Sequence, residues 1–195
     1  MRWLAATIVV LCIAVTVWLG TAITTVGHIA SAARAGDGAA ILARTDVMAV
    51  RRSLTEQVVE AYLKRAGETR KVSQIERMVA NTYGATVTDA MIAKLVTAEN
   101  LTKLLKNGRI DGVDNIPTLE GLPTLGDIKT DDVLGVLGRI GLVQPVLLSF
   151  RISPTADPDA TALVYLHLDG DGWRLSGFEL PKAIVRQLAA SLPVR

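Results

Sequence analysis

The sequence predicts an α+β fold in which about four amphipathic helices pack on a C-terminal antiparallel meander of about three strands, followed by a short terminal helix. Three patterns predict it: a long uncharged run at the start, several stretches with hydrophobic residues three or four apart, and alternating segments near the end. Half of the 195 residues are hydrophobic and the mean hydropathy is +0.35, yet 21% are charged. These values indicate an apolar segment joined to a soluble domain of ordinary composition.

The first element is a transmembrane helix. No charged residue lies between Arg2 and Arg34, and residues 3–23 would extend about 30 Å as a helix, enough to cross the hydrocarbon core of a bilayer. We therefore expect residues 1–26 to form an uncleaved signal anchor that contacts the lipid bilayer through residues 3–23. The short N-terminus favours an inside position for it, with the soluble domain in the periplasm. The alternative is a signal peptide cleaved among the small residues around Arg34, which would release a secreted protein.

Residues 27–106 form the helical half of the soluble domain, with a break at residues 36–38. Asp46 is placed as the N-cap of a helix that Gly67 ends, and a second helix is expected to end at Gly84. The residues expected on buried helix faces are Val47, Val50, Leu54, Val58 and Tyr62, then Val72, Ile75, Val79 and Tyr83, then Val87, Met91 and Leu95, and finally Leu101, Leu104 and Leu105. The opposite face of the first of these helices carries Arg51, Arg52, Glu56, Glu60 and Lys64, and we expect it to face solvent.

Two further helix starts are visible in the same half. Thr86 with Asp89 three residues later is typical of a capping box, and Thr97 precedes the last helix of this region. Because none of these helices can bury its apolar face alone, we expect them to pack on one another.

Residues 107–128 are rich in Gly and Pro and are expected to form a loop. Residues 129–195 form the strand half with its terminal helix. Within it we expect a short helix after Thr130, strands at 146–152, 163–168 and 173–180, a loop at 153–159, a hairpin turn at 169–172 and a helix at 182–192.

The sequence offers little material for catalysis or metal binding. There are two His and one Cys, and Cys12 lies within the apolar run. His28 follows the span and is expected at headgroup level. His167 lies in a predicted strand without any nucleophile motif. We therefore predict no catalytic, cofactor-binding or metal-binding residue and no cofactor.

Two acidic pairs were considered as sites. Asp131 and Asp132 are interpreted as first-turn residues that favour the helix dipole. Asp169 and Asp171 resemble the start of a calcium loop, but the twelfth position is Leu180, so a hairpin turn is the better interpretation.

Charge differs between the two halves of the soluble part. Residues 34–109 carry 13 basic and 8 acidic residues, whereas residues 110–195 carry 7 basic and 11 acidic ones. The basic half could rest on anionic headgroups, or it could be an ordinary mixed surface with ion pairs along its helices. With few aromatic residues and no basic cluster on a strand platform, nucleic-acid binding is not expected.

Several short motifs resemble a bacterial family of membrane-anchored proteins, the domain of unknown function 2939. They are residues 35–43, Asp46-Val47, residues 50–54, residues 95–101, Trp173-Arg174-Leu175 and Glu179-Leu180-Pro181. The chain departs from the family pattern at Met48, where an aromatic residue is expected, and in its Gly/Pro-rich middle. The resemblance implies an N-terminal membrane segment and a mixed helical and strand domain, and it implies no activity. By looser analogy, the element order is similar to cone-shaped folds of the cystatin and nuclear-transport-factor types.

These observations favour a non-enzymatic binding or assembly module at the bacterial cell envelope, whose partner is a protein or an apolar ligand. The alternative is a small hydrolase or isomerase that uses Asp and His167 in a pocket. His167 within hydrogen-bond reach of a carboxylate in a deep pocket would favour the alternative.

Overall fold

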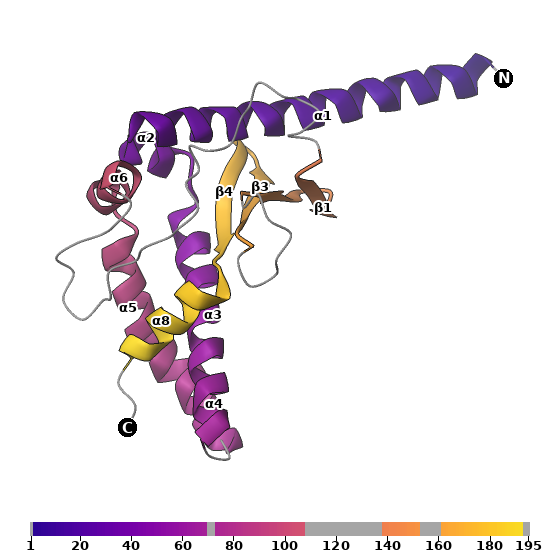
Figure 1. Ribbon diagram of the computed structural model, residues 1–195. Helices are drawn as coiled ribbons and strands as arrows, with labels where there is room; N and C mark the ends of the chain where they lie inside the picture. The colour runs from indigo at the N-terminus through magenta and orange to yellow at the C-terminus, as the bar shows by residue number, and fades with distance from the viewer. Residues whose placement is uncertain (1, 70–72, 108–137, 153–160, 193–195) are drawn as a thin grey trace.

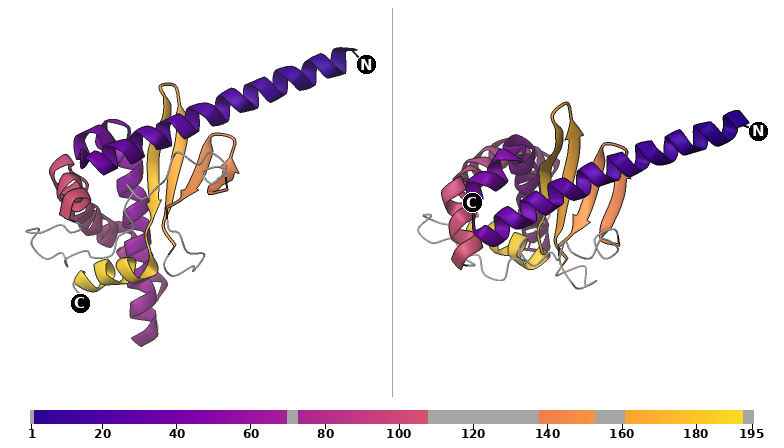
Figure 2. Two further views of the ribbon diagram at one scale, coloured as in Figure 1. Left: turned by 45° about the horizontal axis from the view of Figure 1, so that its top comes forward. Right: turned by 90° about the horizontal axis from the view of Figure 1, so that it is seen from above.

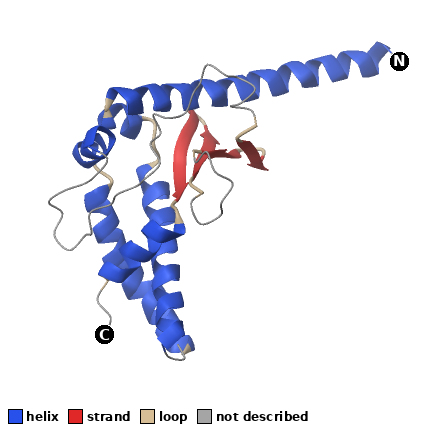
Figure 3. Ribbon diagram, in the orientation of Figure 1, coloured by secondary structure: helices blue, strands red, loops and turns tan. Residues whose placement is uncertain are grey.

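A computed structural model of the chain describes residues 2–69, 73–107, 138–152 and 161–192. It has a long N-terminal helix, further helices and a four-stranded antiparallel sheet, so the predicted mixed α+β class is confirmed (Figures 1 and 3). The expected loop beyond Asn107, the helix after Thr130 with Asp131 and Asp132, and the loop at 153–159 lie outside the described residues.

The N-terminal helix α1 (Arg2–Ala35) is continuous and passes residue 26 without a break. Its side chains from Trp3 to Val17 are exposed, whereas the second half of the helix is partly built into the domain. Among the described residues, this is the one helix that is long and apolar enough to cross a membrane. It extends well beyond the rest of the molecule at its N-terminal end (Figure 2).

The expected break after α1 is present. Gly36 has a φ of +66°, a left-handed conformation that glycine adopts readily and that ends the helix. The backbone N–H of Ala40 then donates to the Asp37 carboxylate at 2.9 Å, which caps the short helix α2 (Gly38–Ala43).

Helix α3 (Val47–Thr69) begins as predicted, because the N–H of Ala49 donates to the Asp46 carboxylate at 3.0 Å. Val50, Leu54 and Val58 on its predicted inner face are buried. The helix continues through Gly67, so the prediction that this glycine ends it is wrong.

The next helical region differs from the prediction at Gly84. Helix α4 (Gln74–Val79) continues through a π-helical segment, η1 (Ala80–Gly84), into helix α5 (Ala85–Leu95). Gly84 has a φ of −61°, so it carries the helix onward and does not cap it. The Thr86 hydroxyl donates to the Thr82 carbonyl inside the helix, so the capping-box interpretation is also wrong.

Burial on this region also differs from the expected faces. Ile75, Val79, Tyr83 and Val87 are exposed because the N-terminal part of this helical run extends, with the end of α3, beyond the sheet and the other helices (Figure 1). Leu95 is buried as expected. Helix α6 (Ala98–Asn107) begins where the sequence predicts it: the N–H of Asn100 donates to the Thr97 hydroxyl at 3.2 Å.

The sheet has the strand order β1-β2-β3-β4, with every neighbouring pair antiparallel. The strands are β1 (Ile140–Gln144), β2 (Leu147–Arg151), β3 (Leu163–Asp169) and β4 (Gly172–Glu179). The last three match the predicted strands within one residue, and β1 was not predicted. Trp173, Leu175 and Gly177 are buried along β4, as their alternation indicates. Helix α8 (Lys182–Ser191) follows Pro181.

The core lies between the sheet and the helices α1, α3 and α8. Helix α3 packs along both β4 and α8, and α1 crosses β4. The segment that joins α2 to α3 also pairs with β4, because the N–H of Leu175 donates to the Arg44 carbonyl at 2.9 Å and the N–H of Asp46 donates to the Leu175 carbonyl at 2.7 Å. The long N-terminal helix is therefore attached to the sheet both directly and through the chain that follows it.

Candidate functional site

The junction between α1 and the sheet is the first functional feature. The rings of Trp18 and Trp173 meet edge to face with centroids 5.3 Å apart. The indole N–H of Trp173 donates to the Thr21 hydroxyl at 3.2 Å. Below this contact, five apolar side chains of α1 belong to the domain core: Ala22, Val26, Ile29, Ala30 and Ala33. The part of α1 before Trp18 is therefore apolar and exposed, whereas the part after Trp18 contributes side chains to the core.

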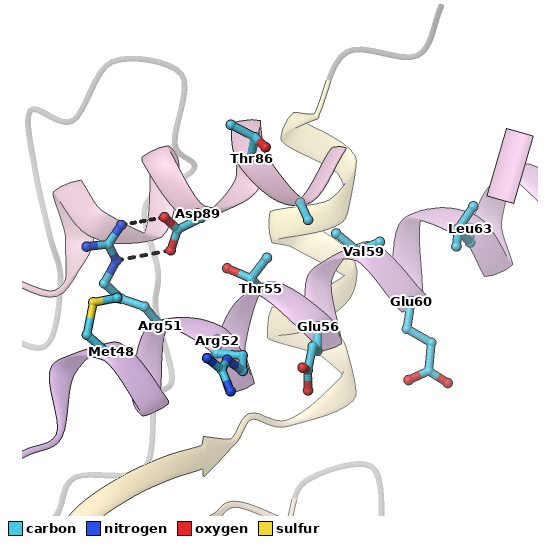
Figure 4. A pocket seen from close by; sticks show the side chains of 11 residues that line it. Met48, Arg51, Arg52, Thr55, Glu56, Val59, Glu60, Leu63, Thr86 and Asp89 are labelled. Atoms are coloured by element: carbon cyan, nitrogen blue, oxygen red, sulfur yellow. Dashed lines mark hydrogen bonds and ion pairs between the residues drawn. The ribbon is translucent and has the colours of Figure 1, made fainter. Parts of the chain in front are cut away.

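The second feature is an open groove of about 870 Å³ between α3 and α5 (Figure 4). Its lining combines apolar side chains, among them Met48, Val59 and Leu63, with charged side chains of both signs. Arg52 and Glu56 belong to the face of α3 that the sequence assigns to solvent, and the structure places them along this groove.

An ion pair joins the two walls of the groove. Arg51 on α3 donates from Nε to Oδ1 of Asp89 on α5 at 3.0 Å, and its Nη2 binds the other carboxylate oxygen (Figure 4). This bidentate ion pair fixes the orientation of the guanidinium and the carboxylate, and it connects residues 38 positions apart in the chain. Sequence reasoning missed the pair because Arg51 was assigned to a solvated face and Asp89 to a helix cap.

Two buried hydroxyls lie on the same pair of helices. The side chains of Thr55 and Thr88 are 7% and 0% exposed, and neither hydroxyl has a hydrogen-bond partner within the part of the chain that the structure describes. Thr55 lines the groove. A buried hydroxyl without a partner is costly, so both positions lower the stability of this pair of helices.

The residues considered from the sequence do not gather at this groove. His167 is exposed on β3 and is not among the groove residues, so the hydrolase or isomerase alternative receives no geometric support. Cys12 is exposed on the protruding half of α1. His28 is exposed on the other half, between the buried Val26 and Ile29.

The turn of acidic residues between β3 and β4 is a hairpin turn. The N–H of Asp171 donates to the Asp169 carboxylate at 2.9 Å, and Gly172 has a φ of +116°. Arg174 pairs with Asp169 at 3.1 Å and with Asp171 at 2.9 Å. No cluster of three or more metal-binding side chains occurs in the described ranges.

Two side chains outside the groove have shifted pKa values. Burial, together with a 2.9 Å hydrogen bond from its hydroxyl to Glu179, raises the pKa of Tyr165 to about 12. On α6, the hydrogen bond and the charge of Lys103 lower the pKa of Glu99. The causes are local burial and a hydrogen-bonded neighbour, and neither shift indicates a catalytic group.

Comparison with known families gives one match. Residues 10–104 match the family described as "Protein of unknown function (DUF2939)". The matched residues extend from α1 into α6, and the match confirms the resemblance over this part of the chain. The later motifs at 173–175 and 179–181 lie outside the matched residues. No curated protein and no solved structure matches the chain.

Proposed function

We propose that the protein is a non-enzymatic binding module of the bacterial cell envelope, held in the inner membrane by an uncleaved α1. Its N-terminus lies inside and its domain lies in the periplasm. The observation that carries the proposal is the division of α1 into an exposed apolar half and a half that belongs to the core.

The burial of α1 supports an anchor over a cleaved signal peptide. Cleavage near Arg34 would remove Ala22, Val26, Ile29 and Ala30 from the core, together with the contacts of Trp18. A cleaved signal peptide is dispensable for the mature fold, whereas this segment fills space next to β4. The exposed apolar half, in contrast, is not covered by any part of the chain that the structure describes, and it is suited to lipid.

The shape and lining of the groove favour a polypeptide partner over an apolar small ligand. An apolar ligand is normally enclosed by an apolar cavity, but this groove is open and carries charges of both signs beside Met48 and Val59. Such a surface suits an amphipathic segment that places apolar side chains in the groove and polar ones along its charged rim.

Topology is tested with reporters fused to the C-terminus in bacterial cells. An active periplasmic reporter and an inactive cytoplasmic one, both recovered in the membrane fraction, are expected. The reverse reporter pattern would contradict the proposed location, and recovery in the soluble fraction would contradict the anchor.

Partner binding is tested with a photocrosslinking residue at position 48, which lies in the groove and is 70% exposed. The matched control carries the same residue at position 167, which is exposed on the sheet. A discrete adduct from position 48 and not from position 167 is expected. Equal adducts from both positions, or none from position 48, would contradict a binding role for the groove.

A further inference from the structure

The hairpin formed by β1 and β2 has an unusual composition for a sheet edge. No charged residue occurs from Ile140 to Phe150, and an arginine stands on each side of this run. The N–H of Arg151 donates to the carbonyl of Arg139 at 3.0 Å, so the two arginines face each other at the open end of the hairpin. Edge strands of soluble proteins usually carry charges that prevent association, and this one carries none in its paired part.

The apolar side chains near the turn of this hairpin are exposed. Leu142, Val143 and Val146 are 67%, 50% and 42% exposed. The register between β1 and β2 shifts between Leu142 and Gln144, and such a bulge redirects side chains. Leu142 and Val143 are neighbours and would point to opposite faces of a regular strand, but at this bulge both are exposed.

The position of the hairpin relates it to the membrane helix. Of the described elements of the sheet and the helices below α1, the β1–β2 hairpin lies furthest toward the N-terminal end of α1, and the views agree on this (Figures 1 and 2). In Figure 1 it lies below the middle of α1. The hairpin is thus on the side of the domain that a bilayer around α1 would meet.

The length of the exposed half sets how close the bilayer must come. The segment from Trp3 to Val17 extends about 22 Å as a helix, whereas the hydrocarbon core is about 30 Å thick. The missing length must come from the next turns of α1, where Trp18 and Thr21 already contact Trp173 of β4. A spanning α1 therefore brings this end of the sheet into the interfacial layer, a depth that tryptophan favours.

We propose that the β1–β2 hairpin is a second membrane contact, in which Leu142, Val143 and Val146 enter the interfacial layer of the bilayer that α1 spans. Arg139 and Arg151 lie at headgroup level. Their backbones pair at the open end of the hairpin, and both guanidinium groups can bind lipid phosphates at that level. This inference rests on the proposed role of α1 as an anchor, and it adds a contact that fixes the rotation of the domain about α1.

The test measures the depth of three labels in the full-length protein, reconstituted in two sets of vesicles whose lipids carry a nitroxide quencher either near the headgroup or in the middle of the acyl chain. Each variant contains Cys12→Ser, which removes the single cysteine, and one new cysteine for a fluorophore. The positions are Val143→Cys in the hairpin, Val79→Cys as a control, and Val10→Cys in α1. Val143 and Val79 are 50% and 49% exposed, so the two positions differ in location and not in accessibility.

We expect the headgroup quencher to reduce the fluorescence of the label at position 143 roughly threefold or more relative to its effect on the label at position 79. The reason is that an interfacial residue lies within about 5–10 Å of the headgroup boundary. Quenching at position 10 without quenching at position 143 would overturn the hairpin contact and leave the anchor intact. Absence of quenching at position 10 would overturn the anchor and, with it, the hairpin contact. If the label at position 143 is not quenched and the unlabelled Val143→Cys variant forms a disulfide-linked dimer on oxidation, the proposal is overturned in favour of an edge-to-edge dimer.

Discussion

Replacement of Ile29 by alanine tests whether the second half of α1 is part of the core. Ile29 is 4% exposed and belongs to the main hydrophobic cluster. The substitution removes three carbon atoms, each worth about 0.8 kcal/mol in transfer free energy, and leaves a cavity that adds to the cost. We expect a loss of about 3 kcal/mol in the free energy of unfolding, equivalent to a decrease of about 6–12 °C in Tm for a chain of this size.

The chain offers a matched control on the same helix. Ile13 is 58% exposed in the protruding half of α1, so Ile13→Ala removes the same atoms without opening a cavity. Its free energy of unfolding should stay within about 0.5 kcal/mol of the wild-type value. Both variants are measured by urea unfolding of the full-length protein in mild detergent, with the fluorescence of the tryptophans as the readout.

Two results of this comparison between Ile29→Ala, Ile13→Ala and wild type would refute the reasoning. If the unfolding midpoint of Ile29→Ala equals that of wild type, the packed half of α1 contributes nothing to the domain. The same conclusion follows if the two variants lose equal stability, because burial then makes no difference. In either case, removal of the segment as a signal peptide would again be compatible with the fold.

Three other predictions concern the domain. Arg51→Met and Asp89→Leu should each destabilise by about 1–2 kcal/mol, and the double variant by less than their sum; additive losses in a double-mutant cycle would show that the pair is uncoupled. Because the pKa of Tyr165 in the folded state is raised from 10.0 to about 12, its stabilising contribution is complete below pH 10 and is lost as the pH rises toward 12. The stability advantage of wild type over Tyr165→Phe should therefore fall between pH 10 and 12 in urea unfolding, and a difference that stays constant over this range would contradict the raised pKa of Tyr165. Gly38→Ala should lower Tm because its new Cβ would lie 2.4 Å from a backbone oxygen of α6, whereas Gly20→Ala, with no neighbour within 4 Å, should leave it unchanged; equal melting temperatures would refute the close packing of α2 on α6.

Local signals in the sequence were sufficient for most of the described elements. Asp46 and Thr97 cap helices because a short polar side chain before an amphipathic stretch can accept a backbone N–H. The alternation from Trp173 and the turn at Asp169–Gly172 predicted the last hairpin. These features depend on residues within a few positions of each other, so a single sequence contains the necessary information.

The features that sequence reasoning missed depend on distant contacts. Hydropathy does not distinguish Val9, which is exposed, from Val26, which is buried against the domain, because lipid and protein core favour the same side chains. The strand β1 follows directly on residues 108–137, and its exposed Leu142 gives no regular alternation. Continuation of the helix through Gly84 depends on its surroundings, since glycine is permissive in either conformation.

The candidate site was the least predictable part. The sequence predicts no site residue, and the groove arises only where α3 and α5 are brought together by packing. Arg51 and Asp89 are each ordinary helix-surface residues until the fold places them opposite one another. Such pairs become visible only when the tertiary arrangement is known.

The central claim is that α1 stays attached to the domain as both anchor and core element. The most direct measurement is the intact mass of the protein purified from bacterial membranes, combined with identification of its N-terminal residue. We expect a chain that retains the whole of α1 (Arg2–Ala35). A mature protein that begins near Arg34 would contradict it, because both the anchor and the buried half of the helix would then be absent from the functional molecule.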